Sequence, residues 1–473
     1  MKKSIVRIAS FLVILVLCLG YLNSVFKVKY GDGIYSVTKF YELESDTVDV
    51  LILGSSHAFE DFNTGTLWDE YGLSSYVLGG SIQPMWNTYY YLKEALKTQT
   101  PDLIVLEGFC TTFSSEYIDD SRIIKNNYGL KWSTDKIESL KVSSPPERWG
   151  EFFLEYSQYH TRYKELSRAD FVKNQGNPLY EDWKGFGCNM AVNPYEVIDV
   201  RGVEERASLF EKTEKYYRET IELALDNNIP ILIIISPYAG INEDEQKKFN
   251  TALDIADEYG VPFVNCNLID EIGMDWTVDA ADSGHLSYRG NQKFSKYIGK
   301  YLVDNYNLTD HRGEPEYASW EENAQFIRQM IYDQELYESA ELSAIIEKLQ
   351  NDNYWTFISV DGTCNTEEST FEILFDRYGI PKDGSNGIWF ISNEGLWDTT
   401  MDNGEFFRRT DSHDFHLRRS IEENGNGTNE IIIDNENYKK VTNGVNIIVY
   451  DVLTEKVADT IGFNADDEYA IVR

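Results

Sequence analysis

The sequence has few basic residues, and this shortage limits the partners that the protein is expected to have. Lysine and arginine number 43 against 79 aspartates and glutamates in 473 residues, a formal net charge of -36. A nucleic acid backbone would be repelled by such a chain, so nucleic acid is not an expected partner. Docking of the body on an anionic membrane face is disfavoured for the same reason. A solvated surface explains the acidity better than a specific cation site does.

Cysteine and histidine are also scarce. The five cysteines, Cys18, Cys110, Cys188, Cys266 and Cys364, are widely spaced and form no C-x-x-C pair. This pattern argues against a zinc site and against a disulfide scaffold. With only six histidines in the chain, few side chains are candidates for a catalytic base.

One long apolar run stands at the N-terminus. Lys2, Lys3 and Arg7 precede an apolar stretch that extends from Ile8 to about Leu22, close to the length that a bilayer requires. Positive residues on the N-terminal flank predict that this flank stays in the cytoplasm and that the body lies outside. A cleaved signal peptide is the alternative, but no A-x-A-like site follows the run. We expect residues 1–27 to form a single-pass membrane anchor.

The body alternates apolar strand-like runs with helical stretches. The predicted strands are Val48–Leu53, Ser74–Gly79, Pro101–Phe109, Ile229–Tyr238 and Pro262–Asn267; the clearest helices are Trp86–Lys97, Lys212–Asn228 and Asp244–Gly260. Nearly continuous apolar strands between helices predict an α/β fold whose parallel sheet is covered on both faces. We assign this domain to residues 28–307, with a long insertion at about 117–206 that breaks the alternation.

The pattern changes after residue 307. Residues 308–352 are charged and helical, as in a linker or in packing helices, and residues 353–473 contain a new series of strands with one short helix. A chain of 473 residues is too long for one ordinary domain. We therefore expect a smaller α+β domain at the C-terminal end. The alternative is a small α/β cap that binds no ligand.

The first predicted strand ends in Gly54-Ser55-Ser56-His57. Ligands of open parallel sheets bind beyond the carboxyl ends of the strands, and a glycine there permits a tight turn. A serine becomes a nucleophile only when a base lies within hydrogen-bond reach and a third group orients that base. Adjacent side chains rarely point at one another, so His57 is not the expected base.

His285 is the better candidate for the base. It follows the last predicted strand, and Asp282 precedes it by three residues in D-x-x-H. This spacing lets one loop hold a carboxylate against an imidazole and so select its tautomer. The alternative is an ordinary polar loop in which Ser287 caps the next helix.

These two stretches together resemble the SGNH/GDSL hydrolases. That family has Gly-Asp-Ser after its first strand and D-x-x-H near the end of its domain, and the resemblance covers about Val48 to Tyr306. It implies a three-layer α/β/α fold in which Ser56 is the nucleophile, His285 the base and Asp282 the orienting acid. The likeness is greatest to anchored extracytoplasmic bacterial members that act in O-acylation, such as the D-alanine transfer protein of teichoic acids and the alginate acetylation proteins.

Two positions depart from the family pattern. Ser55 stands where the family has aspartate, and the third block, Gly-x-Asn-Asp, has no asparagine in "LEGFCTT", where Cys110 or Thr111 stands instead. Loss of one oxyanion donor costs roughly 2.7–4 kcal/mol of transition-state stabilisation. The donors that remain are the backbone N–H groups near Ser56 and at Gly80, and the side-chain amide of Gln83. Gly79-Gly80 is equally well explained as a strand-ending turn.

Four further residues are candidates for substrate contacts. His57 is expected to line the cleft, and Glu107 either faces the site or is a solvent-facing strand end. His160 and Arg162, in the insertion, are substrate candidates with packing or surface roles as the alternative.

The C-terminal region carries a second resemblance. "NGVNIIVYD" followed by "VADTIGFNA" resembles the interleukin-like EMT inducer (ILEI) domain over roughly Asn353 to Arg473, although Asn464 replaces the aspartate of its Phe-Asp pair. Related domains are linked to glycan binding, which suits an enzyme acting on a surface polymer.

The expected function is that of an anchored, extracytoplasmic acyl esterase or O-acyltransferase. The expected partners are a cell-surface glycan or teichoic acid, the membrane and a membrane-bound O-acyltransferase. This chemistry requires no metal and no cofactor. Two alternatives stay open: an inactive SGNH scaffold that serves a membrane acyltransferase, and a carbohydrate-binding surface protein.

Overall fold

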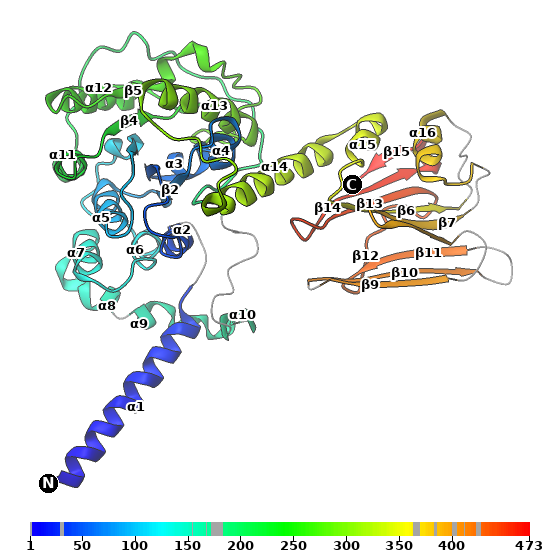
Figure 1. Cartoon of the computed structure of the whole chain (residues 1–473), viewed down its shortest axis with the longest axis horizontal. Helices are drawn as coiled ribbons and strands as arrows, with labels where there is room; N and C mark the ends of the chain where they lie inside the picture. Colours follow the sequence, from blue (N-terminus) through cyan, green and yellow to red (C-terminus); the bar gives the residue numbers. More distant parts are fainter. Residues whose placement is uncertain are drawn as a thin grey trace. The chain divides into compact units, whose positions relative to one another are not determined.

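The computed structural model describes residues 2–28, 33–153, 155–166, 168–171, 183–362, 369–382, 386–399, 404–410, 412–421 and 427–473. The chain divides into two compact units, Met1–Gln325 and Phe326–Arg473. Figure 1 shows a parallel sheet surrounded by helices in the first unit and antiparallel strands in the second.

A five-stranded parallel sheet forms the centre of the first unit. Its strands are β1 (Val50–Gly54), β2 (Ser75–Gly79), β3 (Leu103–Glu107), β4 (Ile231–Ile235) and β5 (Phe263–Asn265), in the order β2-β1-β3-β4-β5. Every residue of the first four strands is buried, because helices cover both faces of a parallel sheet. Four of the strands lie within the ranges expected from the sequence, and β1 extends one residue beyond the expected Val48–Leu53, to Gly54.

Two hydrophobic cores separate the sheet from two layers of helices. One core contains side chains of α2 (Ile34–Phe40), α5 (Met85–Ala95), α11 (Glu211–Asp226) and α12 (Glu243–Glu258). The core on the other face contains side chains of α3 (Ser56–Asp61), α4 (Thr64–Tyr71) and α13 (Tyr288–Asn305). Alternate residues of β1 enter opposite cores: Leu51 and Leu53 one, Val50 and Ile52 the other. The predicted α/β class with helices on both faces is confirmed.

The first part of the insertion, up to residue 171, is largely helical where it is described. Its elements are α6 (Asp120–Asn127), α7 (Thr134–Ser143), η2 (Pro146–Arg148), α8 (Trp149–Phe153), α9 (Glu155–Tyr159), η3 (His160–Lys164) and α10 (Arg168–Phe171). Residues 188–209 then run without a helix or strand to the start of α11. The N-terminal helix α1 (Lys2–Phe26) is apolar and long enough to cross a membrane, a test that a signal sequence also passes.

The second unit is built on two antiparallel sheets. One has the order β15-β14-β13-β6-β7-β8 and the other β12-β11-β10-β9. The strands are β6 (Tyr354–Asp361), β7 (Gly387–Ser392), β8 (Gly395–Thr399), β9 (Gly404–Arg409), β10 (Asp414–Ile421), β11 (Gly427–Ile433), β12 (Glu436–Asn437), β13 (Gly444–Asp451), β14 (Lys456–Asn464) and β15 (Ala470–Val472). An aromatic-rich core that includes Trp355, Phe357 and Phe415 lies between the sheets.

Helices cover the other face of the six-stranded sheet. Side chains of α15 (Leu342–Lys348) and α16 (Ser369–Tyr378) share a core with Ile358, Ile447 and Ile461. The smaller α+β domain expected at the C-terminal end is therefore present, and its strands are antiparallel. The division between the units falls inside α14 (Ala318–Glu338), within the segment 308–352 that the sequence analysis assigned to a helical linker.

Candidate active site

Ser56 is the first residue of α3 and follows β1 after a single intervening residue. The turn depends on close packing at Gly54, where a Cβ atom would lie 2.8 Å from Cβ of Glu107 and 2.9 Å from Cβ of Ala58. Only glycine permits this approach of the end of β1 to β3 and α3. The backbone N–H groups of the first turn of α3 have no partners within the helix. Ser56 is thus presented beyond the carboxyl edge of the sheet.

Asp282 and His285 lie on a tight turn before α13. The Ala281 N–H donates to the His285 carbonyl oxygen over 2.9 Å, and Asp282 Oδ1 accepts from the N–H groups of Gly284 (2.7 Å) and His285 (3.0 Å). Ser287 caps α13 by accepting from the N–H groups of Arg289 and Gly290. The carboxylate of Asp282 is therefore held by the backbone of the same loop that carries the imidazole.

The tertiary fold brings these three side chains together. Ser56 Oγ lies 2.7 Å from Nε2 of His285, and both carboxylate oxygens of Asp282 lie 2.9 Å from Nδ1 of His285. Burial raises the pKa of Asp282, but the hydrogen bonds from the His285 ring and the Gly284 N–H outweigh this effect and leave the pKa below its usual value. An ionised Asp282 selects the imidazole tautomer with a proton on Nδ1.

The site is open at its surface. The side chains of His285 and Asp282 are 22% and 48% exposed. Glu60, one helical turn after Ser56 on α3, places Oε1 3.9 Å from Nε2 of His285. The sequence analysis missed this carboxylate, although the i, i+4 spacing within a short helix puts Glu60 on the same face as the serine.

His57 lies beneath the triad, where the sequence analysis expected a cleft-lining residue. Its side chain is 1% exposed and stacks on Phe109 at 3.8 Å between ring centroids, with Tyr238 at 4.9 Å and His285 at 5.3 Å. Burial, reinforced by the nearby His285, holds the pKa of His57 well below its usual value. His57 is therefore a neutral packing partner of the triad histidine rather than a group open to substrate.

Two buried acids lie under the carboxyl ends of the strands. Asp61 accepts from the Leu286 N–H over 3.0 Å and from Ser236 Oγ over 2.8 Å, and burial raises its pKa well above the usual value. Asp61 thereby links α3, which carries Ser56, to the residue after His285. Glu107 is fully buried, so the alternative of a solvent-facing strand end is wrong. Burial raises the pKa of Glu107 to about 8.

The predicted oxyanion residues lie on the loop after β2. A Cβ atom at Gly80 would lie 2.3 Å from Oδ1 of Asn126 and 3.4 Å from Oε1 of Gln83, so a larger residue here would displace the Asn126 side chain. The amide nitrogen of Gln83 donates to Thr88 Oγ1 over 3.0 Å. Among the described residues, no hydrogen bond joins Gln83 to the triad. In the same loop Ile82 has φ 47°, a conformation that β-branched residues rarely adopt.

The two insertion candidates lie elsewhere. Arg162 donates to the Phe26 carbonyl oxygen and to Asp170 (2.9 Å), and no hydrogen bond or ion pair among the described residues joins it to the triad. The backbone of His160 belongs to η3, but its side chain lies outside the described part of the structure. Arg162 therefore holds together elements near the end of α1 rather than the site at Ser56.

A cavity of about 260 Å³ opens beside β4 and β5. Its walls include Pro237, Asn267, Met274 and Trp276, and none of the three triad residues lines it. The Tyr195 N–H donates to the Trp276 carbonyl oxygen over 2.8 Å, so the extended segment before α11 runs alongside the loop that leads to Asp282.

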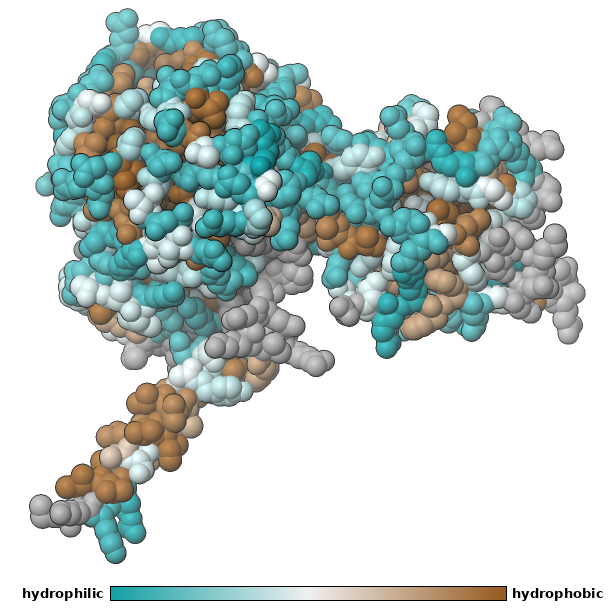
Figure 2. All heavy atoms as spheres, viewed as in Figure 1, coloured by the Kyte–Doolittle hydropathy of each residue, from teal (hydrophilic) through white to brown (hydrophobic). Residues whose placement is uncertain are grey.

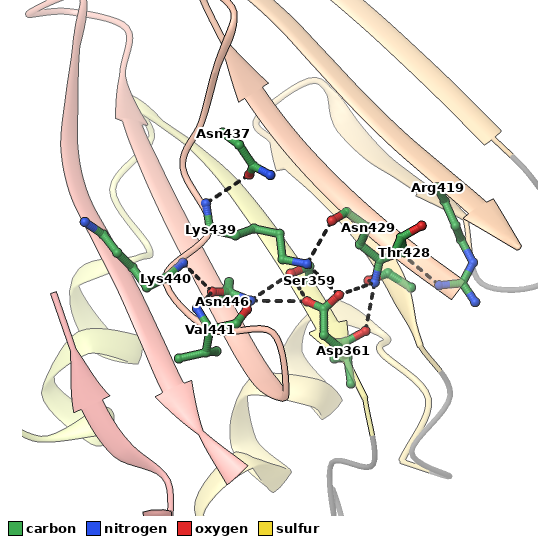
Figure 3. Close-up of polar contacts among 12 residues, drawn as sticks. Ser359, Asp361, Arg419, Thr428, Asn429, Asn437, Lys439, Lys440, Val441 and Asn446 are labelled. Carbon is green, nitrogen blue, oxygen red and sulfur yellow. Dashed lines mark hydrogen bonds and ion pairs between the residues drawn. The ribbon is translucent and has the colours of Figure 1, made fainter. Parts of the chain in front are cut away.

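The second unit contains its own buried polar cluster, around Asp361 (Figure 3). Asp361 Oδ1 accepts from Lys439 Nζ (2.7 Å) and Asn429 Nδ2 (3.0 Å), and Oδ2 accepts from Ser359 Oγ (2.6 Å) and Asn446 Nδ2 (3.2 Å). All of the carboxylate's hydrogen-bonding capacity is used within the unit, which is typical of a structural cluster. Within the described ranges no group of three or more His, Cys, Asp or Glu side chains is arranged to hold a metal ion.

Comparisons with known proteins give limited information. No family model matches the chain, and no curated protein matches it significantly. Among solved structures, a protein of Bacteroides fragilis assigned as an acylhydrolase matches at 11% identity and a TM-score of 0.28, over 57% of this chain and 94% of that one. A GDSL-like lipase of Bacteroides thetaiotaomicron matches at 11% identity and a TM-score of 0.27, over 56% and 96%. Scores this low carry no argument about function, which rests on the side-chain geometry.

Proposed function

We propose that the chain is a membrane-anchored extracytoplasmic serine esterase or O-acyltransferase that acts on cell-surface polysaccharide or teichoic acid. The observation that carries this proposal is the continuous contact from Ser56 Oγ through His285 to Asp282, at 2.7 and 2.9 Å. A serine hydroxyl, an imidazole and an orienting carboxylate at these distances form the arrangement that activates serine as a nucleophile.

The proposed reaction begins with proton transfer from Ser56 Oγ to His285 Nε2 as Oγ attacks the carbonyl carbon of an acyl ester. Asp282 stabilises the imidazolium that results, because its carboxylate accepts a hydrogen bond from the Nδ1–H group. The negative charge that develops on the carbonyl oxygen needs hydrogen-bond donors. The backbone N–H groups in the first turn of α3 and at Gly80 are the proposed ones.

Collapse of the tetrahedral intermediate breaks the ester C–O bond. His285 returns its proton to the leaving alkoxide, and the acyl group stays on Ser56 as an ester. In the second half-reaction His285 takes a proton from the accepting hydroxyl as its oxygen attacks the acyl carbon. The bond between the acyl carbon and Oγ then breaks, and His285 returns the proton to Ser56 Oγ. Water as acceptor gives hydrolysis, and a sugar hydroxyl gives transfer.

The polymer substrate is proposed from the openness of the site. The partly exposed His285 and Asp282 side chains allow an acylated group on a large polymer to reach Ser56 without entering a deep tunnel. The apolar helix α1 supports the anchored location, because its positively charged residues precede the apolar run.

An inactive scaffold that serves a membrane acyltransferase is the second candidate. It is favoured by the segment after β3, where Cys110 and Thr111 are buried in η1 (Phe109–Thr112) and Thr111 Oγ1 donates to the Gly108 carbonyl oxygen. This segment presents no side-chain amide as an oxyanion donor.

A fluorophosphonate probe separates these candidates. Active serine hydrolases are phosphonylated at the nucleophile, so the enzyme proposal expects stoichiometric labelling of the full chain at Ser56, located by peptide mass spectrometry. Labelling should be lost in Ser56→Ala and retained in Ser55→Ala. Absence of labelling in a folded protein would support the scaffold and contradict the enzyme.

A further inference from the structure

The C-terminal turn of α1 is packed into the first unit. Val25 is 4% exposed, Asn23 Nδ2 donates to Glu155 Oε2 over 3.3 Å, and Lys27 Nζ donates to the Tyr128 carbonyl oxygen over 2.8 Å. Figure 1 shows α9 and α10 beside this end of the helix. The insertion therefore holds the point at which the apolar helix enters the folded domain.

Asn23 completes a buried ionic cluster. Glu155 Oε1 lies 2.6 Å from Lys136 Nζ, and the two side chains are 3% and 1% exposed. A buried ion pair is stable only when its remaining hydrogen-bonding groups are satisfied. Removal of α1 would take away the amide donor to Glu155. If α1 were cleaved off as a signal peptide, the mature domain would lose these buried contacts. They therefore favour a helix that is retained.

Exposed aromatic side chains surround the same point. Tyr163 in η3 is 62% exposed and Phe171 at the end of α10 is 57% exposed, while Tyr21 on α1 is 60% exposed. Lys164 places its ammonium 5.6 Å from the centroid of the Tyr163 ring. Arg162 ties η3 to both neighbours by donating to the Phe26 carbonyl oxygen and to Asp170.

The helix itself exposes a nearly continuous apolar surface up to this cluster, visible in brown in Figure 2. Its exposed apolar side chains include Leu15, Leu17, Leu19 and Leu22. The apolar stretch of α1 ends at Asn23, whose side chain donates to Glu155. A membrane interface would therefore lie at the level of η3 and α10, the depth at which tyrosine and other amphipathic side chains gather in membrane proteins.

We propose that η3 and α10 are seated in the headgroup region of the membrane that α1 spans, with Tyr163 and Phe171 inserted at the interface. This inference rests on the proposed anchor and adds a second lipid contact to it. Lys164 is placed to meet lipid phosphates while its stem covers apolar surface. The acidity of the whole chain opposes docking of the body on anionic lipid, so the contact is confined to this segment. Its consequence is that the catalytic unit is held against the membrane instead of moving freely on a tether.

Photocrosslinking tests the proposal on the full-length chain. p-Benzoylphenylalanine replaces Tyr163, Phe171, Leu19 or Phe407 in separate variants, each reconstituted in vesicles of phosphatidylcholine with one fifth phosphatidylglycerol. Leu19 reports on the span, and Phe407 is the matched control because it is an equally exposed aromatic residue (59%) on β9 of the second unit. Lipid adducts are identified by peptide mass spectrometry after irradiation.

We expect adducts at positions 19, 163 and 171, with yields at 163 and 171 at least several-fold above that at 407. Adducts at position 19 alone would agree with the membrane anchor but overturn the proposed contact of η3 and α10 with the headgroups. Absence of adducts at position 19 would contradict both the anchor and that contact. Equal yields at 163, 171 and 407 would show non-specific adsorption and also overturn the inference. Fluorophosphonate labelling of Ser56 reports the enzyme separately, so failure of the headgroup contact does not imply failure of the chemistry.

Discussion

The buried polar cluster beside Ser56 in the first unit and the one around Asp361 in the second unit differ in how far their hydrogen-bonding groups are satisfied. In the first unit, Glu107 Oε2, His57 Nδ1 and Ser55 Oγ are buried with no hydrogen-bond partner among the described residues. In the second unit, both carboxylate oxygens of Asp361 accept two hydrogen bonds each. Both clusters lie at strand ends, yet only the first borders an exposed imidazole.

This difference distinguishes a candidate site from a structural cluster. A carboxylate whose two oxygens are both satisfied, such as that of Asp361, specifies how strands pack and stabilises them. Unsatisfied buried groups cost free energy, and natural proteins tolerate them most often where chemistry takes place. Polar residues at a strand end thus become evidence of function only when their contacts are known.

The largest expected effect comes from Ser56→Ala. Without its nucleophile the first unit should lose acyl-ester turnover by about three orders of magnitude or more. The free energy of unfolding should change by no more than about 0.5 kcal/mol, as for surface substitutions. Hydrolysis of an activated acetyl ester and a urea titration measure the two quantities. Retained turnover would remove Ser56 from the proposed mechanism.

Asp361→Ala should produce the converse result. It leaves Lys439, whose side chain is 11% exposed, without its ion-pair partner at 2.7 Å, and such a loss costs about 3–5 kcal/mol. Hydrogen exchange should show weaker protection of β6 and β13, while labelling of Ser56 by fluorophosphonate persists. Loss of protection in β1 and β3 instead would show that the cluster does not act within its own unit.

Glu107→Gln tests how much the burial of an ionisable carboxyl group lowers the free energy of unfolding at high pH. Because the folded-state pKa is about 8 against an ordinary 4.5, the folded state binds more protons between these values. The contribution of Glu107 to stability therefore falls as pH rises from about 4.5 to 8. The variant lacks this fall and should be more stable than the natural chain at pH 8, by a few kcal/mol, with little difference near pH 4.5.

Urea titrations at pH 5 and pH 8 measure that change, with exposed Glu271→Gln as the control for the loss of one negative charge. If the two variants have the same dependence on pH, burial does not raise the pKa of Glu107.

Ser55→Ala should have the smallest effect. Its hydroxyl is buried without a partner among the described residues, so removal should change the free energy of unfolding by no more than about 0.5 kcal/mol in either direction. Turnover should stay within a few-fold of the natural chain. Inactivity of Ser55→Ala beside an active Ser56→Ala would move the nucleophile by one residue.

Hydrophobic pattern predicted the parallel sheet because its signal is local. Strands such as β1 and β4 are buried on both faces. Nearly every residue of such a strand is therefore apolar, and the sequence shows a continuous apolar run. The helix that covers residues 318–338 was less predictable. Its charged composition suited either a linker or packing helices, and the composition alone did not reveal that Trp320 and Leu336 are buried in hydrophobic cores.

The candidate triad was predictable for a similar reason. Gly-Ser-Ser-His and D-x-x-H are short motifs at the ends of a strand and a loop, so their residues could be named before their distances were known. Glu60 and Asp61 could not be named in this way, because their relation to His285 and Leu286 depends on contacts between residues more than 200 positions apart.

The sequence by itself determined the apolar N-terminal helix and the parallel-sheet class, which depend on residue type and local spacing. It also named three residues that suit serine chemistry, through the resemblance of two short motifs to those of the SGNH/GDSL hydrolases. Only the tertiary structure decided that His57 is buried, that Arg162 contacts the end of α1, and that Asn23 completes the ion pair of Glu155. These outcomes depend on which distant segments pack together, because burial and hydrogen bonding are properties of the assembled fold.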